Sequence, residues 1–236
     1  IVAIDNEVDA DLSAFPLVRL GLGQIGGILK AFRKAGCREL VIVGGVTRPD
    51  LAKLRPDFGL FANLPRVVSL VFSGGDDGVL RVVVRFFEQK GFTVVSPAEL
   101  VPSLVVGPGN LTSDTPSSAD IADMLLGSSV VKALGVYDIG QAVIVSDGQL
   151  IAIEAAEGTD RMLARIAAQT KSKPKGANPA GLKRGVLVKR PKPGQEMRID
   201  LPAIGPATIT RAADAGLAGI AVLAGQALAA QRLELL

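Results

Sequence analysis

The chain has 236 residues, 48% of them hydrophobic and 21% charged, with a net charge of +3. This length suits one large or two modest domains with real cores, and the composition excludes a disordered or fibrous chain. It contains no histidine and a single cysteine, Cys37. Ser-His-Asp triads, Cys-His pairs, His-ligated metal centres, thiolate metal sites and disulfide frameworks are therefore excluded, and a reducing cytoplasm is expected. Any bound metal should be a hard cation on carboxylates, Mg²⁺ or Mn²⁺.

The first hundred residues alternate between strand-like and helix-like segments. Strands are predicted at 1–5, 16–20, 39–45 and 92–97, and helices at 24–36 and 74–92. Strands separated by helices predict a Rossmann-like parallel α/β domain, which we place at residues 1–102. The chain opens without methionine on a strand-like segment, so we expect an incomplete N-terminus.

The hexapeptide GLGQIG at residues 21–26 matches the glycine fingerprint of dinucleotide-binding folds. The helix that should follow it is predicted, but its preceding strand is short. No acidic residue follows the next strand, where one would contact a ribose. The glycines equally suit a strand-to-helix turn that packs closely without a ligand.

A Pro- and Gly-rich segment at 103–117 is predicted to be a linker, and residues 118–236 to be a second α/β domain with a mixed sheet. The patterns predict a helix at 118–135 with Ser118 as its N-cap. The turn residues Ser146-Asp147-Gly148 between two strand-like segments predict a β-hairpin. Helices are predicted at 158–169 and 207–216, a strand at 185–190, a loop at 191–206, and a final strand at 217–225.

Two helix starts carry acidic residues. GGDD at 74–77 places Asp76 and Asp77 where they either cap a helix or line a glycine loop that admits a polar ligand. EGTD at 157–160 offers the hydroxyl of Thr159 and free N–H groups to phosphate oxygens, while Asp160 has an equally good structural role.

Residues 171–192 form a block of cations without an acidic residue, which suits either a solvated loop or an anionic ligand. Nucleic acid is not expected, since the block holds no aromatic residue. At its end, Lys189–Asp200 interleaves cations and carboxylates. Such a loop suits a phosphate–metal site where Lys189 and Arg198 hold oxygens and Asp200 holds the ion.

Several of these segments together resemble the LpxI family, the UDP-2,3-diacylglucosamine pyrophosphatases of lipid A biosynthesis in many Gram-negative bacteria. The matching segments are GGVTRPD (44–50), GGDD (74–77), YDIGQAVIV (137–145), AIEAAEGTDRML (152–163) and GVLVKRPKPGQEMRIDLPAIGPATI (185–209). The resemblance spans about residues 17–225, and the last two segments are specific. A glycine-rich segment that opens the family's sequences is missing here.

The resemblance implies a hydrolase, dependent on Mg²⁺ (or Mn²⁺), that cleaves UDP-2,3-diacylglucosamine to UMP and 2,3-diacylglucosamine 1-phosphate. It implies a catalytic Asp200, which with Asp160 and Glu196 would also hold the metal. Substrate binding would fall to Asp76, Asp77, Thr159, Lys189, Gln195 and Arg198.

The expected partners are the lipid-linked UDP-sugar and, peripherally, the cytoplasmic face of the inner membrane, with a homodimer left open. Two alternatives also remain open. One is an NAD(P)-dependent oxidoreductase that uses the loop at 21–26. The other is a non-catalytic module that binds anionic lipid or nucleotide through residues 171–192.

Overall fold

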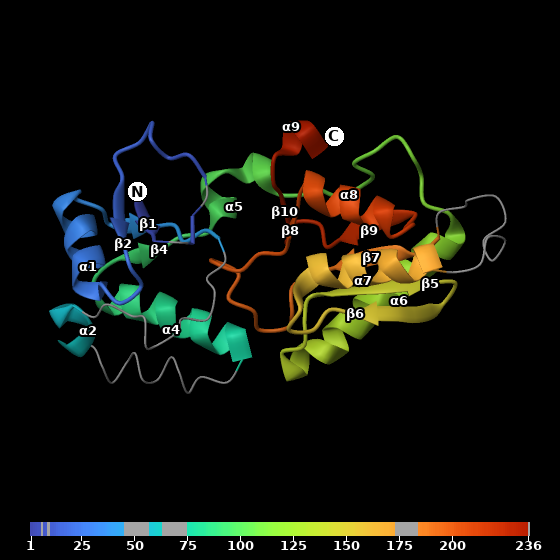
Figure 1. Ribbon diagram of the computed structural model, residues 1–236, viewed down its shortest axis with the longest axis horizontal. Helices are drawn as coiled ribbons and strands as arrows, with labels where there is room; N and C mark the ends of the chain where they lie inside the picture. The colour runs from blue at the N-terminus through green and yellow to red at the C-terminus, as the bar shows by residue number, and fades with distance from the viewer. Residues whose placement is uncertain (6, 9, 45–56, 63–74, 173–183, 236) are drawn as a thin grey trace. The chain divides into compact units, whose positions relative to one another are not determined.

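A computed structural model describes the chain except residues 6, 9, 45–56, 63–74, 173–183 and 236 (Figure 1). The chain divides into two compact α/β units, Ile1–Pro97 and Ala98–Leu236. Within the described residues, no helix is both long and apolar enough to cross a membrane.

The first unit pairs its short strands in parallel. Strand β1 (Val2–Ile4) pairs with β2 (Val18–Leu20), and β3 (Glu39–Leu40) pairs with β4 (Thr93–Val94). Its helices are α1 (Ile25–Lys34), α2 (Phe58–Ala62) and α4 (Gly75–Gln89), and α5 (Pro97–Leu100) crosses the boundary between the units. Among the described residues the parallel strands therefore form two pairs instead of one continuous sheet.

Phenylalanines form the core of the first unit. Phe32 on α1 makes edge-to-face contacts with Phe87 on α4 and with Phe92 just before β4. Leu29 and Leu40 are buried in the same cluster. Such aromatic pairs contribute free energy beyond that of burying their apolar area. These contacts therefore help to hold α1 and α4 against the short strands.

The second unit is built on a four-stranded mixed sheet in the order β6-β5-β7-β9. Strands β5 (Ala142–Ser146) and β6 (Gln149–Ile153) form the expected hairpin, and β7 (Val186–Lys189) runs antiparallel to β5 and parallel to β9 (Gly219–Val222). The other elements are η2 (Pro102–Leu104), α6 (Ser118–Leu134), η3 (Gly135–Tyr137), α7 (Gly158–Ser172), β8 (Ala203–Ile204), α8 (Pro206–Asp214), β10 (Leu228–Ala229) and α9 (Arg232–Leu235).

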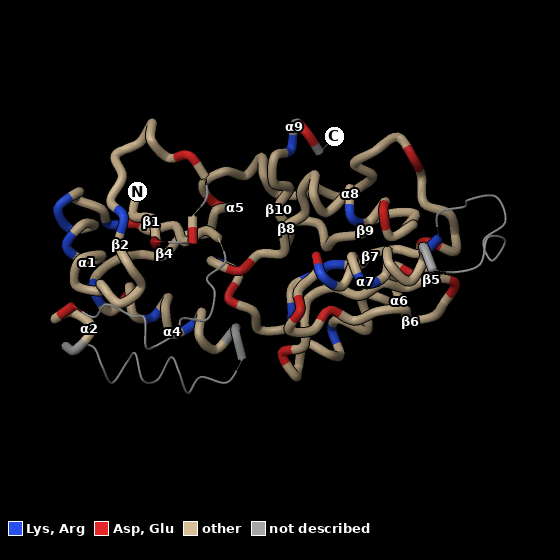
Figure 2. The backbone as a smooth tube through the Cα atoms, viewed as in Figure 1, with Lys and Arg blue, Asp and Glu red and all other residues tan. Residues whose placement is uncertain are grey.

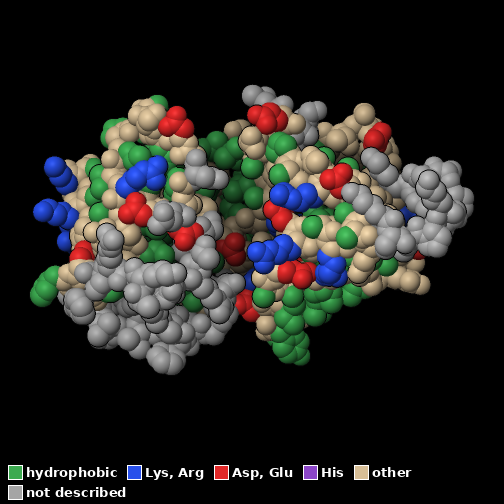
Figure 3. All heavy atoms as spheres, viewed as in Figure 1, with side chains coloured by type: hydrophobic (Ala, Val, Ile, Leu, Met, Phe, Trp, Pro, Cys, Tyr) green, Lys and Arg blue, Asp and Glu red, His purple; other side chains and the backbone are tan. Residues whose placement is uncertain are grey.

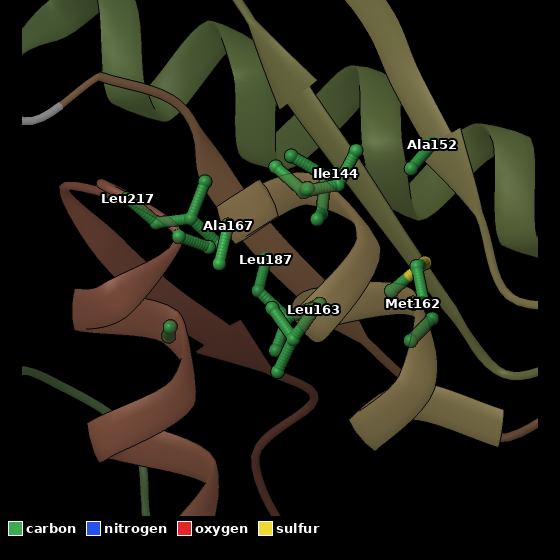
Figure 4. Close-up of a cluster of buried hydrophobic side chains, with 11 residues drawn as sticks. Ile144, Ala152, Met162, Leu163, Ala167, Leu187 and Leu217 are labelled. Carbon is green, nitrogen blue, oxygen red and sulfur yellow. The ribbon is translucent and has the colours of Figure 1, made fainter. Parts of the chain in front are cut away.

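Helices cover both faces of this sheet. On one face, Ile144 and Leu187 pack with Met162 and Leu163 of α7 and with Ala212 of α8 (Figure 4). On the other, Val143 and its neighbours pack against Val131 of α6. Since successive strand side chains point to opposite faces, each strand divides its residues between the two cores.

The hairpin turn is fixed by a buried carboxylate from α6. Asp147 and Gly148 adopt left-handed backbone angles, as a two-residue hairpin turn requires. Their backbone N–H groups donate to Asp123, at 3.0 Å and 2.7 Å. The tip of the hairpin is therefore tied to the helix that covers the sheet.

Three local expectations are wrong. The strand predicted through residue 45 ends at Leu40, and Val43 is largely exposed. Helix α6 is capped by Ser117, in a capping box with Asp120, instead of by Ser118. Residues 217–225 do not hold the final strand, because β10 follows and pairs with β8 inside the expected loop. Strands of two residues show no periodicity, so only their tertiary pairing reveals them.

Candidate functional site

The glycine-rich loop at 21–26 does connect a strand to a helix, since β2 precedes it and α1 follows. Its helix N-terminus is occupied by a side chain of the protein, because the N–H groups of Gly26 and Gly27 donate to the carboxylate of Asp57 at 3.2 Å and 2.8 Å. Burial opposes ionisation of Asp57. The backbone N–H groups nonetheless hold its pKa below the ordinary value.

The glycines of this loop serve close packing. A Cβ at Gly26 would lie 2.9 Å from Asp57 Oδ2, and one at Gly59 would lie 2.3 Å from the nitrogen of Gly26. Because the amides that would bind a pyrophosphate already hold a carboxylate, the loop gives no support to dinucleotide binding.

A second polar group lies in the second unit, at the end of the sheet nearest the start of α7. Lys189 pairs with Ala142 across β7 and β5, and the N–H of Glu154 donates to the carbonyl of Ala142 at 2.9 Å. Lys189 and Glu154 thus lie in one row on either side of the small Ala142. They share the face of Leu187 and Ala152, two residues earlier in their strands, so both side chains lie at the edge of the α7/α8 core.

Lys189 is a buried cation among carboxylates. Only 8% of it is exposed, and its Nζ donates to the carbonyl of Ala203 at 3.1 Å. Burial lowers the pKa of Lys189, while the charges of Glu154, Asp160 and Asp200 act in the opposite direction. The lysine therefore brings three carboxylates from separate segments into one electrostatic group.

Glu154 is the buried acceptor of this group, and it was not among the predicted site residues. Its two oxygens accept from the N–H of Gln141 at 3.1 Å and from the hydroxyl of Thr159 at 3.0 Å. Thr159, expected to bind substrate, is itself buried and directs its proton to Glu154. The alternation of side chains along β6 could have indicated that Glu154 is buried, because it places Glu154 on the same side of the sheet as Ala152.

Gln195 organises the loop that carries Asp200. Its side-chain nitrogen donates to the carbonyl oxygen of Asp200 at 2.7 Å and to Oδ2 of Asp200 at 2.6 Å. Its side-chain oxygen accepts from the N–H of Lys192 at 2.7 Å. Both amide protons are thus directed at Asp200, and the buried Gln195 fixes how its carboxylate points.

The three carboxylates expected to hold a metal have cationic or amide neighbours. Arg198 contacts both oxygens of Glu196 at 2.8 Å, Arg211 pairs with Asp160 at 3.2 Å, and Gln195 donates to Asp200. Acidic and basic positions occur together around α7 (Figure 2). The carboxylate oxygens of Asp160, Glu196 and Asp200 are of the type that Mg²⁺ prefers. In the part of the chain that the structure describes, however, no three acidic or cysteine side chains group closely enough to hold an ion.

Asp76 and Asp77 are the second and third residues of α4, so their place at a helix start is confirmed. Their side chains lie outside the described part of the chain. They belong to the first unit, whereas Thr159, Lys189, Gln195, Arg198 and Asp200 belong to the second. Most of the basic block, residues 173–183, also lies outside the described residues.

The fold and site together define a two-unit α/β protein whose polar centre uses carboxylates, lysine and amide groups without histidine. Family models match both units: the LpxI N-terminal domain at residues 1–104 and the LpxI C-terminal domain at 107–236. The UDP-2,3-diacylglucosamine pyrophosphatase LpxI of Caulobacter vibrioides is 39% identical over 233 residues, covering 98% of this chain and 81% of that protein. The chain belongs to the LpxI family.

Proposed function

We propose that the chain hydrolyses the diphosphate of UDP-2,3-diacylglucosamine to UMP and 2,3-diacylglucosamine 1-phosphate, a step of lipid A biosynthesis. The observation that carries this proposal is the identity of 39% to the Caulobacter pyrophosphatase, which extends over almost the whole chain and both units. A centre without histidine fits the reaction, because hydrolysis of a phosphoanhydride depends mainly on positioning and on stabilising charge.

In this proposal Asp200 is the catalytic residue and orients the attacking water as its general base. The support is the clamp from Gln195, which holds the carboxylate in one orientation before substrate arrives. Asp200 also interacts electrostatically with the buried Lys189, so a cation lies near the proposed base.

The remaining site residues divide into two groups. We propose that Arg198 contacts substrate. The binding roles of Asp76 and Asp77 stay predictions, because their side chains lie outside the described residues. Thr159, Gln195 and Lys189 have their polar atoms engaged within the protein, at Glu154, Asp200 and Ala203, and this supports a role in holding the site together.

Mg²⁺ (or Mn²⁺) is part of the proposal, and it would neutralise phosphate oxygens when bound. Asp200, Asp160 and Glu196 were the predicted ligands, but the described residues hold no group of three acidic side chains close enough for one ion. The proposal therefore includes the metal and not this set of three ligands. We also propose a Rossmann-like first unit and a peripheral position at the cytoplasmic face of the inner membrane.

The test is phosphorus NMR of UDP-2,3-diacylglucosamine dispersed in detergent and incubated with the protein, with Mg²⁺ or with EDTA. We expect UMP and the sugar 1-phosphate to form with Mg²⁺ and not with EDTA. Asp200→Ala should lower the rate by about 10²- to 10⁴-fold, because it removes the general base.

Asp214→Ala is the matched control, since Asp214 lies exposed at the end of α8 in the same unit. Its rate should equal that of the unchanged chain. If the unchanged chain released no UMP, the proposed reaction would be wrong. Full activity of Asp200→Ala would instead reject only the role of Asp200, and undiminished turnover in EDTA only the metal.

A further inference from the structure

Helix α6 carries apolar side chains on the face that it turns away from the sheet. Ile121 and Leu125 are exposed one turn apart, and Lys132 lies on the same side two turns further on, just before the exposed Val136 of η3. The opposite side of α6 is buried, with Gly127 so close to Val188 that a Cβ would lie 2.6 Å from it. The sheet therefore leaves this apolar stripe without a covering element among the described residues.

The stripe ends in a projecting apolar tip. Val136 and Tyr137 of η3 are each 76% exposed, and Ile139 follows them. Figure 3 shows hydrophobic side chains along the lower edge of the second unit, over α6 and the segment after it. Exposed apolar side chains gathered in this way indicate a contact surface, whereas scattered ones carry no such meaning.

Cations adjoin this tip. Lys132, Arg190 and Lys192 line one pocket of about 290 Å³ beside η3. A Cβ at Gly135, where η3 begins, would lie 2.5 Å from Pro193 and 3.2 Å from the side chain of Lys192, so the tip and the cations touch. Lys192 is largely buried and paired with Asp138, so the exposed Lys132 and the partly buried Arg190 supply the positive charge beside the apolar tip.

We propose that α6 and η3 form a docking surface for an anionic phospholipid membrane. Val136 and Tyr137 enter the interface between headgroups and acyl chains, and Lys132, with Arg190 beside it, binds phosphate oxygens of the headgroups. An apolar stripe that ends in basic residues is the arrangement by which interfacial helices bind anionic lipid. The inference rests on the proposed peripheral location, to which it assigns a surface.

A second copy of the chain is the other candidate occupant of this face. A two-fold contact would place the same patch on both partners, and so would bring Lys132 and its neighbouring cations toward their counterparts. Like charges across a contact oppose association, whereas anionic headgroups complement them. The charge of the patch therefore favours lipid.

The test is sedimentation of the full chain with vesicles of phosphatidylcholine alone or with added phosphatidylglycerol, in the absence of substrate. We expect binding to the phosphatidylglycerol vesicles, weakened by salt. Lys132→Glu should reduce the affinity at least about fivefold, since each cation near an anionic surface contributes about that factor. Val136→Ser with Tyr137→Ser should reduce it on the order of tenfold.

Val43→Ser is the matched apolar control, because Val43 is also 76% exposed but lies in the first unit, and Lys30→Glu is the charge control. Both should bind like the unchanged chain. Equal binding by the patch variants and the controls would overturn the proposal. A chain that did not bind the phosphatidylglycerol vesicles would overturn it as well. A dimer in solution that Val136→Ser dissociates would assign the face to a second copy. UMP release in detergent is unaffected in every case, so loss of this proposal leaves the proposed reaction standing.

Discussion

Gln195 shows how a single residue prepares the candidate catalytic group. It follows Gly194, whose left-handed backbone allows the tight turn after Pro193. The turn places its amide against both the carbonyl and the carboxylate of Asp200. Because both N–H groups of the amide are donated to Asp200, we assign Gln195 to positioning instead of to substrate contact.

Gln195→Ala should therefore lower kcat by about a hundredfold and leave KM almost unchanged, because a carboxylate displaced by even 1 Å positions water poorly. Steady-state hydrolysis of UDP-2,3-diacylglucosamine measures both constants. Gln149→Ala, at an exposed glutamine of β6, is the control and should change neither. A raised KM with an unchanged kcat would show instead that Gln195 contacts the substrate.

At the scale of elements, α1 receives its N-terminal cap from a distant segment. Asp57 accepts from Gly26, Gly27 and Leu60, and so joins the starts of α1 and α2. A carboxylate at a helix start satisfies N–H groups that would otherwise lack partners and complements the helix dipole. This contact keeps the glycine loop closed against α2.

Asp57→Asn should destabilise the first unit by about 1 kcal/mol at neutral pH, because an amide nitrogen replaces one of the two oxygens that accept from the helix N–H groups. The folded state lowers the pKa of Asp57, so its stabilisation is complete above the ordinary value of 3.8 and is lost as pH falls through the lower, folded value. Urea unfolding across that range should show the two proteins converge in acid. Glu39→Gln, exposed on β3, is the control, and a gap that stayed constant in acid would contradict the assignment.

At the scale of the whole molecule, the two units have separate cores. Phe32 and its aromatic partners fill the first, while Ile144 and Leu187 belong to the second. Each unit also has its own buried or partly buried carboxylate clamp, Asp57 in the first and Asp123 in the second. Contacts that are confined to one unit should act on that unit alone.

Asp123→Ala should cost about 1–3 kcal/mol, because it leaves the N–H groups of Asp147 and Gly148 without their acceptor. Hydrogen exchange should speed up in the second unit only, and for Asp57→Asn in the first only. The double variant should equal the sum of the single ones within about 0.5 kcal/mol. Faster exchange in the unmutated unit would show that the two are coupled.

Local patterns were sufficient for most long elements. The helices α1, α4, α6, α7 and α8 and the hairpin of β5 and β6 lie where periodicity, glycines and turn residues predicted them. The candidate site was predictable as the neighbourhood of Thr159, Lys189 and Asp200. The interaction partners of each site residue were not predictable. Glu154 and Lys189, for example, come close only because β6, β5 and β7 pair in this register.

By itself, the sequence determined the class of chemistry. Without histidine and with one cysteine, the groups that remain to act on a diphosphate are chiefly carboxylates, lysines, arginines, amides and hydroxyls, and composition is independent of folding. The tertiary structure decided which amides and carboxylates are already engaged. Asp57 occupies the helix start that had suggested a dinucleotide, and Gln195 holds Asp200. Packing brings these residues together from distant parts of the sequence. A local sequence pattern therefore cannot predict such contacts.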